Sequence, residues 1–362
     1  MMSAVWAMIG TFQTRLMLTL GMVDFEETNV SCRTFFVPGA AGFGDTSCFG
    51  RLFPYYQGIF NIDTVDVGPL SSNLERARRL QAHIRHVYPE WSATNRIHLV
   101  GHSMGCNTIL EMSGLPGVDP SSIAGLVFIS PLVLGVGGTH AFGRGQRVRP
   151  LFRGIRLLLE ICEYVVPLCV RRRLLHTLLP PPKLWLEGRV ENTIFPDLDE
   201  RACDALYRRL LPVIVTKYKI PLKVIATTAT RKIGSAYVLA AKFGAQPLMR
   251  LCAYFLGGDT DHGVGYSLMR EDVSDYTLRP GHHDGVIHLQ TQLGCLPEFV
   301  DVETIDATHL SSIAYVPFGC YYNRQSVQRT IRLLLTFLVE NDHCRLRRAD
   351  ASCHSPDSLT TQ

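Results

Sequence analysis

The chain has 362 residues, of which 46% are apolar, so it can bury a substantial core and is not disordered as a whole. Its 36 basic and 32 acidic side chains leave a net charge of +4, which is too mild for a nucleic-acid-binding surface. The eleven cysteines form no Cys-x-x-Cys pair, which argues against a zinc ribbon or a thioredoxin-type motif. Their odd number argues against a fully paired extracellular framework.

The N-terminal segment, residues 1–30, is apolar but interrupted by Arg15, with no basic stretch before it. It is a poor secretory signal and too broken for a spanning helix, so we interpret it as a weak signal or anchor. Asn29-Val30-Ser31 is a glycosylation sequon, which matters only if the chain is secreted.

Short apolar runs alternate with helical patterns through the first part of the chain. Strands are predicted at residues 34–37, 62–67, 96–100 and 123–130, with helices at 74–86 and 106–112 between them. Ser72 or Asn73 is the predicted N-cap of the helix that follows. Further strands are predicted at 222–227 and 299–304, and an amphipathic helix at 326–339. This alternation predicts an α/β fold, a mostly parallel sheet with helices on both faces.

The strand at 96–100 runs into Gly101-His102-Ser103-Met104-Gly105, and a helix follows. A Gly-x-Ser-x-Gly between a strand and a helix is typical of the nucleophile elbow of an α/β-hydrolase, in which the serine lies on a tight, strained turn above the sheet. The pattern alone is common, and the strand–helix context is what gives it meaning.

A glycine-rich turn, residues 38–44, follows the first predicted strand. Such a turn can cradle a phosphate, but no Lys-Ser or Lys-Thr pair follows this one. The interpretation we prefer is the loop of an α/β-hydrolase that offers a backbone N–H to the oxyanion.

A basic, apolar stretch from Gln146 to Leu179 ends at three prolines, and Arg156, Glu160 and Arg171–Arg173 interrupt it. It is either a core helix of a helical subdomain or a mobile lid whose apolar face covers the active site and turns toward lipid. The predicted organisation is one hydrolase domain over residues 31–340, with a helical lid insertion at about 140–190, and a disordered tail at 341–362.

A serine nucleophile needs a general base, and the base needs an acid that holds its tautomer. In α/β-hydrolases the chain order is serine, acid, histidine, and Asp284 and His309 follow Ser103 in that order. Other residues stay open as the base or the acid: the histidines His262, His282, His283 and His288, and the aspartates Asp259, Asp261, Asp301 and Asp306.

Four segments together resemble the triacylglycerol lipases of the bacillus and staphylococcus type. They are Gly68-Pro69-Leu70-Ser71-Ser72-Asn73, the Gly101–Gly105 elbow, His283-Asp284-Gly285-Val286-Ile287 and Asp306-Ala307-Thr308-His309-Leu310, in the family order. The resemblance implies Ser103 as nucleophile, Asp284 as acid, His309 as base, and the backbone N–H groups of Ala40 and Met104 as oxyanion donors. The chain is much shorter than these enzymes and looks most like the lipase homologues of avian adenoviruses and an avian herpesvirus.

The chain departs from this family at its metal sites and at Pro38, where the bacterial enzymes have a histidine. The positions that match their zinc ligands are Glu75, His83, His86 and Asp197, a set chemically able to bind a structural zinc ion. Two histidines three residues apart are, however, more often a polar helix face. The segment Ala314–Pro317 lacks the acidic calcium ligands, so calcium is not expected, and no cofactor is expected to be required.

The resemblance and the motifs predict a serine ester hydrolase that acts on acylglycerols or phospholipids at a lipid–water interface through the lid, without nucleic acid as a partner. The alternatives are a non-catalytic lipid-binding or host-interaction protein on a lipase scaffold, and a protease or thioesterase of the same fold. The compartment stays open, with a secreted or host-cell-membrane-associated location favoured over a cytoplasmic one.

Overall fold

The computed structural model describes residues 30–39, 60–68, 71–135, 196–228, 284, 287–294, 296–307, 309, 312 and 329–342. Several predictions lie outside these residues: the lid at about 140–190, the N-terminal segment before Val30, the tail beyond residue 342, and the loop at 314–317. Within the described part of the chain, no helix is both long and apolar enough to cross a membrane.

In the described part of the chain, six parallel strands form one sheet in the order β2-β1-β3-β4-β5-β6. Their bounds are Val30–Val37 (β1), Phe60–Thr64 (β2), Ile97–His102 (β3), Ile123–Ile129 (β4), Leu222–Thr228 (β5) and Asp301–Asp306 (β6). The strand order reverses between β1 and β3, and in parallel sheets a site is expected at the carboxyl end of the strands beside such a reversal. The predicted parallel α/β sheet is thus confirmed.

The helices that connect the strands are α3 (Asn73–Val87), α4 (Met104–Ser113), α9 (Glu200–Pro212) and α12 (Leu289–Leu293), and residues 329–342 form the C-terminal helix. Short turns of other helix types lie at Pro120–Ser122 (η1), Pro196–Leu198 (η3) and Val213–Lys217 (η4). Ser72 is the N-cap of α3, as predicted, because its hydroxyl accepts a hydrogen bond from the Glu75 N–H. Helix α9 was not predicted.

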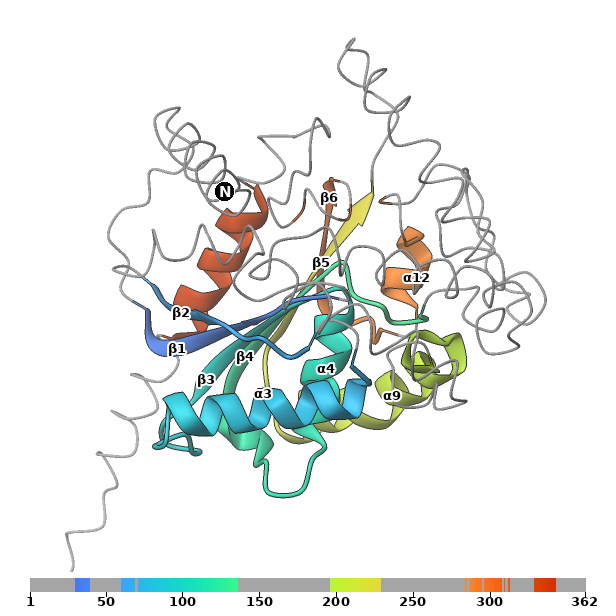
Figure 1. Ribbon diagram of the computed structural model, residues 1–362. Coiled ribbons are helices and arrows are strands. Elements are labelled where there is room, and N and C mark those ends of the chain that lie inside the picture. The colour runs from blue at the N-terminus through green and yellow to red at the C-terminus, as the bar shows by residue number, and fades with distance from the viewer. Residues whose placement is uncertain are drawn as a thin grey trace, which may run out of the picture.

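Alternate residues of the central strands pack into two separate cores. Leu99, Leu126 and Phe128 face α3, α4 and α9, whereas Val100, Val127 and Ile129 face the C-terminal helix. Figure 1 shows α3, α4 and α9 on one side of the sheet and the C-terminal helix on the other. Because both faces are covered, the central strands are apolar without alternation, which is why they appear in the sequence as continuous apolar runs.

The C-terminal helix differs from its prediction at its end. It was expected to end at Val339, with a disordered tail from residue 341, but it continues through Asp342, whose side chain is only 8% exposed. The amphipathic pattern breaks at the polar residues Asn341 and Asp342, so it gave no signal for the last turn. The described part of the predicted tail therefore belongs to the folded domain.

Candidate active site

The turn between β3 and α4 holds Ser103 in a strained backbone conformation, with φ 54° and ψ −125°. Only a few per cent of non-glycine residues have positive φ, and such strain persists where the surroundings enforce it. The Ser103 N–H donates to the Ile129 carbonyl (2.9 Å), and the Ser103 carbonyl accepts from the Cys106 N–H (3.0 Å). These bonds fix the serine between the end of β4 and the first turn of α4, as the elbow pattern predicts.

Two glycines let this turn form by removing side chains that would collide with backbone. A Cβ added to Gly105 would lie 2.1 Å from the Val37 carbonyl oxygen, and one added to Gly101 would lie 2.7 Å from the Cys106 nitrogen. The close approach of α4 to the end of β1 at Gly105 brings the loop after β1 beside the serine: a Cβ on Gly39 would lie 2.9 Å from the Ser103 Cβ.

Gly105→Ala is therefore expected to destabilise the protein by about 3 kcal/mol or more, because α4 would have to move away from β1. The matched control is Gly114→Ala at the end of the same helix, where an added Cβ would lie 3.1 Å from the Leu210 side chain and 3.6 Å, an ordinary contact distance, from the Glu111 carbonyl oxygen. We expect this control to change stability by less than about 1 kcal/mol. Chemical denaturation of both variants measures the difference, and equal stabilities would contradict the packing argument.

His309 and Asp284 form the central polar pair of the site. The His309 Nδ1–H donates to Asp284 Oδ2 (2.7 Å), and the His309 backbone N–H donates to the Asp284 carbonyl (2.9 Å). Both side chains are buried, with 1% of Asp284 and 6% of His309 exposed. A carboxylate that accepts from Nδ1–H leaves the other ring nitrogen, Nε2, as the acceptor, which is the tautomer a general base needs.

Three further donors hold the Asp284 carboxylate. Oδ1 accepts from the Ile287 N–H (2.8 Å), and Oδ2 accepts from the Thr227 hydroxyl (2.8 Å) and the Gln292 amide (3.3 Å). The Ser130 hydroxyl lies 2.6 Å from the Thr227 hydroxyl and extends the chain of hydrogen bonds. Such bonds favour the charged form of a buried carboxylate. Neither Thr227 nor Gln292 could be recognised from the sequence, because both lie in ordinary strand and helix patterns.

His102 connects the Gly101–Gly105 elbow to the loop after β6 that carries His309, which we call the histidine loop. Its Nε2 donates to the His309 carbonyl (2.9 Å), and the two rings lie 4.7 Å apart between centroids. Burial, followed by the nearby His309 ring, lowers the pKa of His102 to about 3, so this ring is neutral at physiological pH. His102, the residue before Ser103, thus links His309 to the serine turn, although no hydrogen bond joins the Ser103 hydroxyl to His309 in the described structure.

Arg76 of α3 is fully buried and hydrogen-bonds to the loop after β1. Its guanidinium donates to the carbonyls of Pro38 (2.6 Å), Gly39 (3.4 Å) and Gly68 (3.0 Å). Burial lowers the pKa of Arg76 to about 9, with Asp66 and Asp197 opposing the change, so the side chain stays charged at neutral pH. Ala40, the first predicted oxyanion donor, lies outside the described residues, whereas the second, Met104, is buried at the first position of α4.

The described alternatives to this acid and base have other contacts. His288 is the N-cap of α12, where its Nδ1 accepts from the Gln290 N–H (3.2 Å). Asp301 pairs with Lys223 (2.8 Å) at the amino end of β6, away from the elbow. Asp306 ends β6 and is exposed. The remaining alternatives, His262, His282, His283, Asp259 and Asp261, lie outside the described residues.

The four predicted zinc ligands do not gather at one point. Asp197 accepts from the backbone N–H of Asn73 at the start of α3 (2.6 Å), whereas His83 lies ten residues further along that helix, about 15 Å away at 1.5 Å per residue. The His83 ring packs edge-on against Phe35 (6.1 Å between centroids), and Glu75 pairs with Arg79 (2.9 Å). These residues therefore do not fit a shared zinc ion.

Residues 31–309 match the alpha/beta hydrolase family, which covers well over half of the chain, so the chain belongs to this family. Among solved structures it is similar to the Staphylococcus hyicus lipase, with a TM-score of 0.57 and 15% identity, over 89% of this chain and 99% of that one. It is also similar to EstA from Clostridium botulinum, with a TM-score of 0.52 and 15% identity, over 89% and 90% of the two chains. No curated protein sequence matches it. At these identities the two structural neighbours establish the fold.

Proposed function

We propose that the protein is a serine ester hydrolase of the lipase type, with Ser103 as nucleophile, His309 as general base and Asp284 as the acid that orients it. The observation that carries the proposal is the buried Asp284–His309 hydrogen bond (2.7 Å), held against the strained serine turn by His102. Acyl transfer by serine requires a general base whose tautomer is set by a third group, and the Asp284–His309 hydrogen bond supports this arrangement.

In the proposed reaction, His309 Nε2 takes the Ser103 proton as the hydroxyl oxygen attacks the ester carbonyl. The Asp284 carboxylate stabilises the imidazolium that forms, and Nε2 then donates the proton to the departing alcohol. The backbone N–H groups of Met104 and Ala40 stabilise the oxyanion. Water, deprotonated by His309, releases the acid from the acyl-enzyme and restores the serine.

Acylglycerols and phospholipids are the proposed substrates, reached at a lipid–water interface through the segment at about 140–190. This part of the proposal rests on the basic, apolar character of that segment and on the sequence motifs shared with bacterial lipases. On the same motifs we propose kinship with the lipase homologues of avian adenoviruses and an avian herpesvirus.

The rival proposal is a non-catalytic lipid-binding protein on the same scaffold. It rests on one observation, the absence of a Ser103–His309 hydrogen bond in the described structure. In the absence of substrate, catalytic hydrogen bonds are often long and tighten only when the substrate binds, so this observation favours the rival weakly.

A fluorophosphonate probe separates the two proposals, because it reacts only with an activated serine. We expect wild type to take up one label per chain at Ser103 and to hydrolyse p-nitrophenyl esters and triolein, and Ser103→Ala to do neither. Ser113→Ala is the matched control, since Ser113 is also buried in α4 but only caps the Ile109 carbonyl (2.8 Å). Folded wild-type protein that stays unlabelled and inactive would establish the rival.

A further inference from the structure

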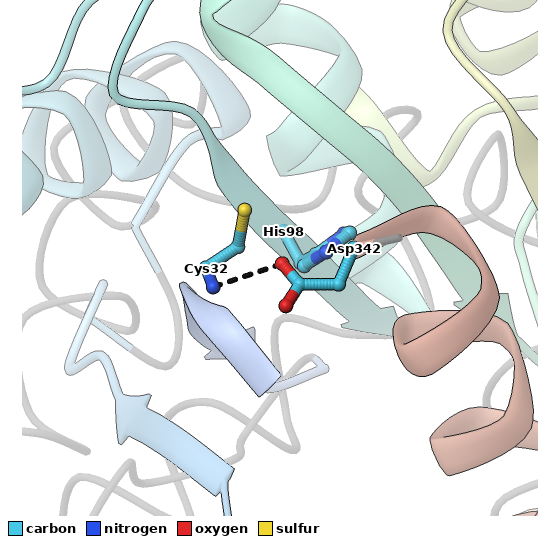
Figure 2. Close-up of side chains that lie close together, drawn as sticks. All are labelled: Cys32, His98 and Asp342. Carbon is cyan, nitrogen blue, oxygen red and sulfur yellow. Dashed lines mark hydrogen bonds between the residues drawn. The ribbon is translucent and has the colours of Figure 1, made fainter. Parts of the chain in front are cut away.

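Three side chains that can bind metal ions meet at the amino end of the central strands, whereas Ser103 follows the carboxyl end of β3. Cys32 lies near the start of β1, His98 near the start of β3, and Asp342 at the end of the C-terminal helix. One ligand atom from each lies within 4.8 Å of the other two, and all three residues are buried. Figure 2 shows the three side chains converging from these elements, with the Cys32 N–H donating to Asp342 Oδ1 (3.0 Å).

His98 is the member of this cluster whose burial the described contacts do not account for. Its ring is fully buried, and among the described residues neither Nδ1 nor Nε2 makes a hydrogen bond of good geometry, although the ring lies close to the backbone of Gly125. Leaving a buried polar group unpaired has a substantial free-energy cost, so such groups are rare and point to an unseen partner. A neutral imidazole has one ring nitrogen with a free lone pair, and this nitrogen is the atom that binds a metal ion.

We propose that Cys32, His98 and Asp342 bind a divalent transition-metal ion, zinc in the first place. Thiolate, imidazole and carboxylate are the three ligand types zinc takes from proteins, whereas magnesium and calcium take oxygen ligands alone. In a tetrahedral zinc site such ligand atoms are about 3.3–3.6 Å apart, so side-chain movements of about 1 Å close the cluster around the ion.

The charges of the cluster fit a divalent cation. Cys32 carries a thiol, and on binding it releases its proton to solvent and becomes a thiolate. The thiolate and the Asp342 carboxylate then contribute two negative charges, which balance the ion in this buried site. A cavity of about 260 Å³ borders Cys32, Arg96 and Asn341, and gives a water molecule room to reach the ion as a fourth ligand.

The proposed ion would join the C-terminal helix to the sheet. Asp342 is 310 residues from Cys32 along the chain, so one ion links the first strand, a central strand and the last described helix. Because His98 and Ser103 lie near opposite ends of β3, the site is separate from the proposed catalytic residues. It does not depend on the proposed function, and its role is structural.

The test is a titration of metal-free, full-length protein with zinc against a competing chromophoric chelator, with the bound metal counted by elemental analysis. Wild type is expected to bind one more zinc ion than His98→Phe, and its thermal midpoint is expected to rise by about 3–4 °C when free zinc is 100-fold above Kd. His98→Phe keeps the packing volume and removes the unpaired nitrogens, so it is expected to fold. Asp342→Asn keeps an acceptor for the Cys32 N–H and is expected to weaken binding at least about tenfold.

Cobalt(II) identifies the ligands directly, because a cysteine thiolate on cobalt produces a charge-transfer absorption. This band is expected in wild type and is expected to be absent in Cys32→Ser. The control is Cys203→Ala, which removes another buried cysteine outside the cluster and is expected to keep the band. If wild type binds no more zinc than His98→Phe, or if the cobalt band survives in Cys32→Ser, the proposal is overturned and His98 is a packed core residue. The wild-type protein must itself bind zinc and show the cobalt band, so the proposal can be rejected even if a variant fails to fold.

Discussion

Asp284→Asn is expected to lower kcat for ester hydrolysis about 10,000-fold, with little change in KM. Asp284 Oδ2 accepts from the His309 ring, the Thr227 hydroxyl and the Gln292 amide, and Oδ1 accepts from the Ile287 N–H. An asparagine NH₂ group at either position faces a donor. If it takes the place of Oδ2, His309 loses its acceptor, and the ring is free to adopt the tautomer with Nε2–H, which cannot accept the serine proton.

The matched control is Asp306→Asn. Asp306 is the other aspartate near the histidine loop that the sequence left open as the acid, and it is exposed at the end of β6. We expect this variant to keep kcat within about threefold of wild type, since surface substitutions away from the reacting groups have small effects. Steady-state ester hydrolysis and the rate of fluorophosphonate labelling should change together. Wild-type activity in Asp284→Asn combined with its loss in Asp306→Asn would reverse the assignment.

The parts of the site that the sequence could predict are those coded by local pattern. The elbow was predictable because two glycines, a serine and a strand–helix boundary are contiguous. The pairing of Asp284 with His309 followed from chain order and from the resemblance, and the hydrogen bond between them agrees with it. Their catalytic role, and that of Ser103, stays a prediction.

What the sequence could not predict depends on contacts between distant segments. Cys32 and Asp342 each look ordinary in their own strand or helix, and only the sheet register and the packing of the last helix bring them to His98. The same reason explains why the predicted zinc ligands, Glu75, His83, His86 and Asp197, do not gather around one point. Their match to the zinc-ligand positions of the bacterial lipases does not show in which direction the helix points each side chain. His83 packs on Phe35, whereas Asp197 contacts the start of the helix.

The burial of Arg76 could have been predicted from the helical periodicity of the sequence. The buried residues of α3 are Asn73, Arg76, Ala77, Leu80 and Ile84, which follow the spacing of a single helical face. An arginine on the apolar face of a helix is an exception, because a charge is rarely fully buried unless it is paired and hydrogen-bonded. The periodicity therefore indicated a buried arginine, although not the loop to which it binds.

Arg76→Met is expected to destabilise the protein by roughly 3–5 kcal/mol, a large share of the stability of a typical domain. Methionine fills much of the volume, but it leaves the Pro38 and Gly68 carbonyls without the donor that the arginine provides. Activity is expected to fall further than stability explains, because the same bonds hold the loop beside Ser103. Arg79→Met is the control on the same helix. Arg79 is about half exposed, and its only ion pair among the described residues is with Glu75, so we expect a loss below about 1 kcal/mol.

The pH dependence of this loss tests the electrostatic part of the argument. Burial raises the pKa of Asp197 above its usual value, while the Asn73 N–H and the Arg76 charge oppose the rise. Without Arg76 the folded-state pKa is expected to rise further, so the folded variant binds a proton more readily than its unfolded chain. A raised carboxyl pKa makes stability fall as pH rises from the unfolded value through the folded one. The difference in unfolding free energy between wild type and Arg76→Met should therefore shrink toward acid pH, and a difference that is constant from pH 4 to 8 would show that lost hydrogen bonds alone account for the effect.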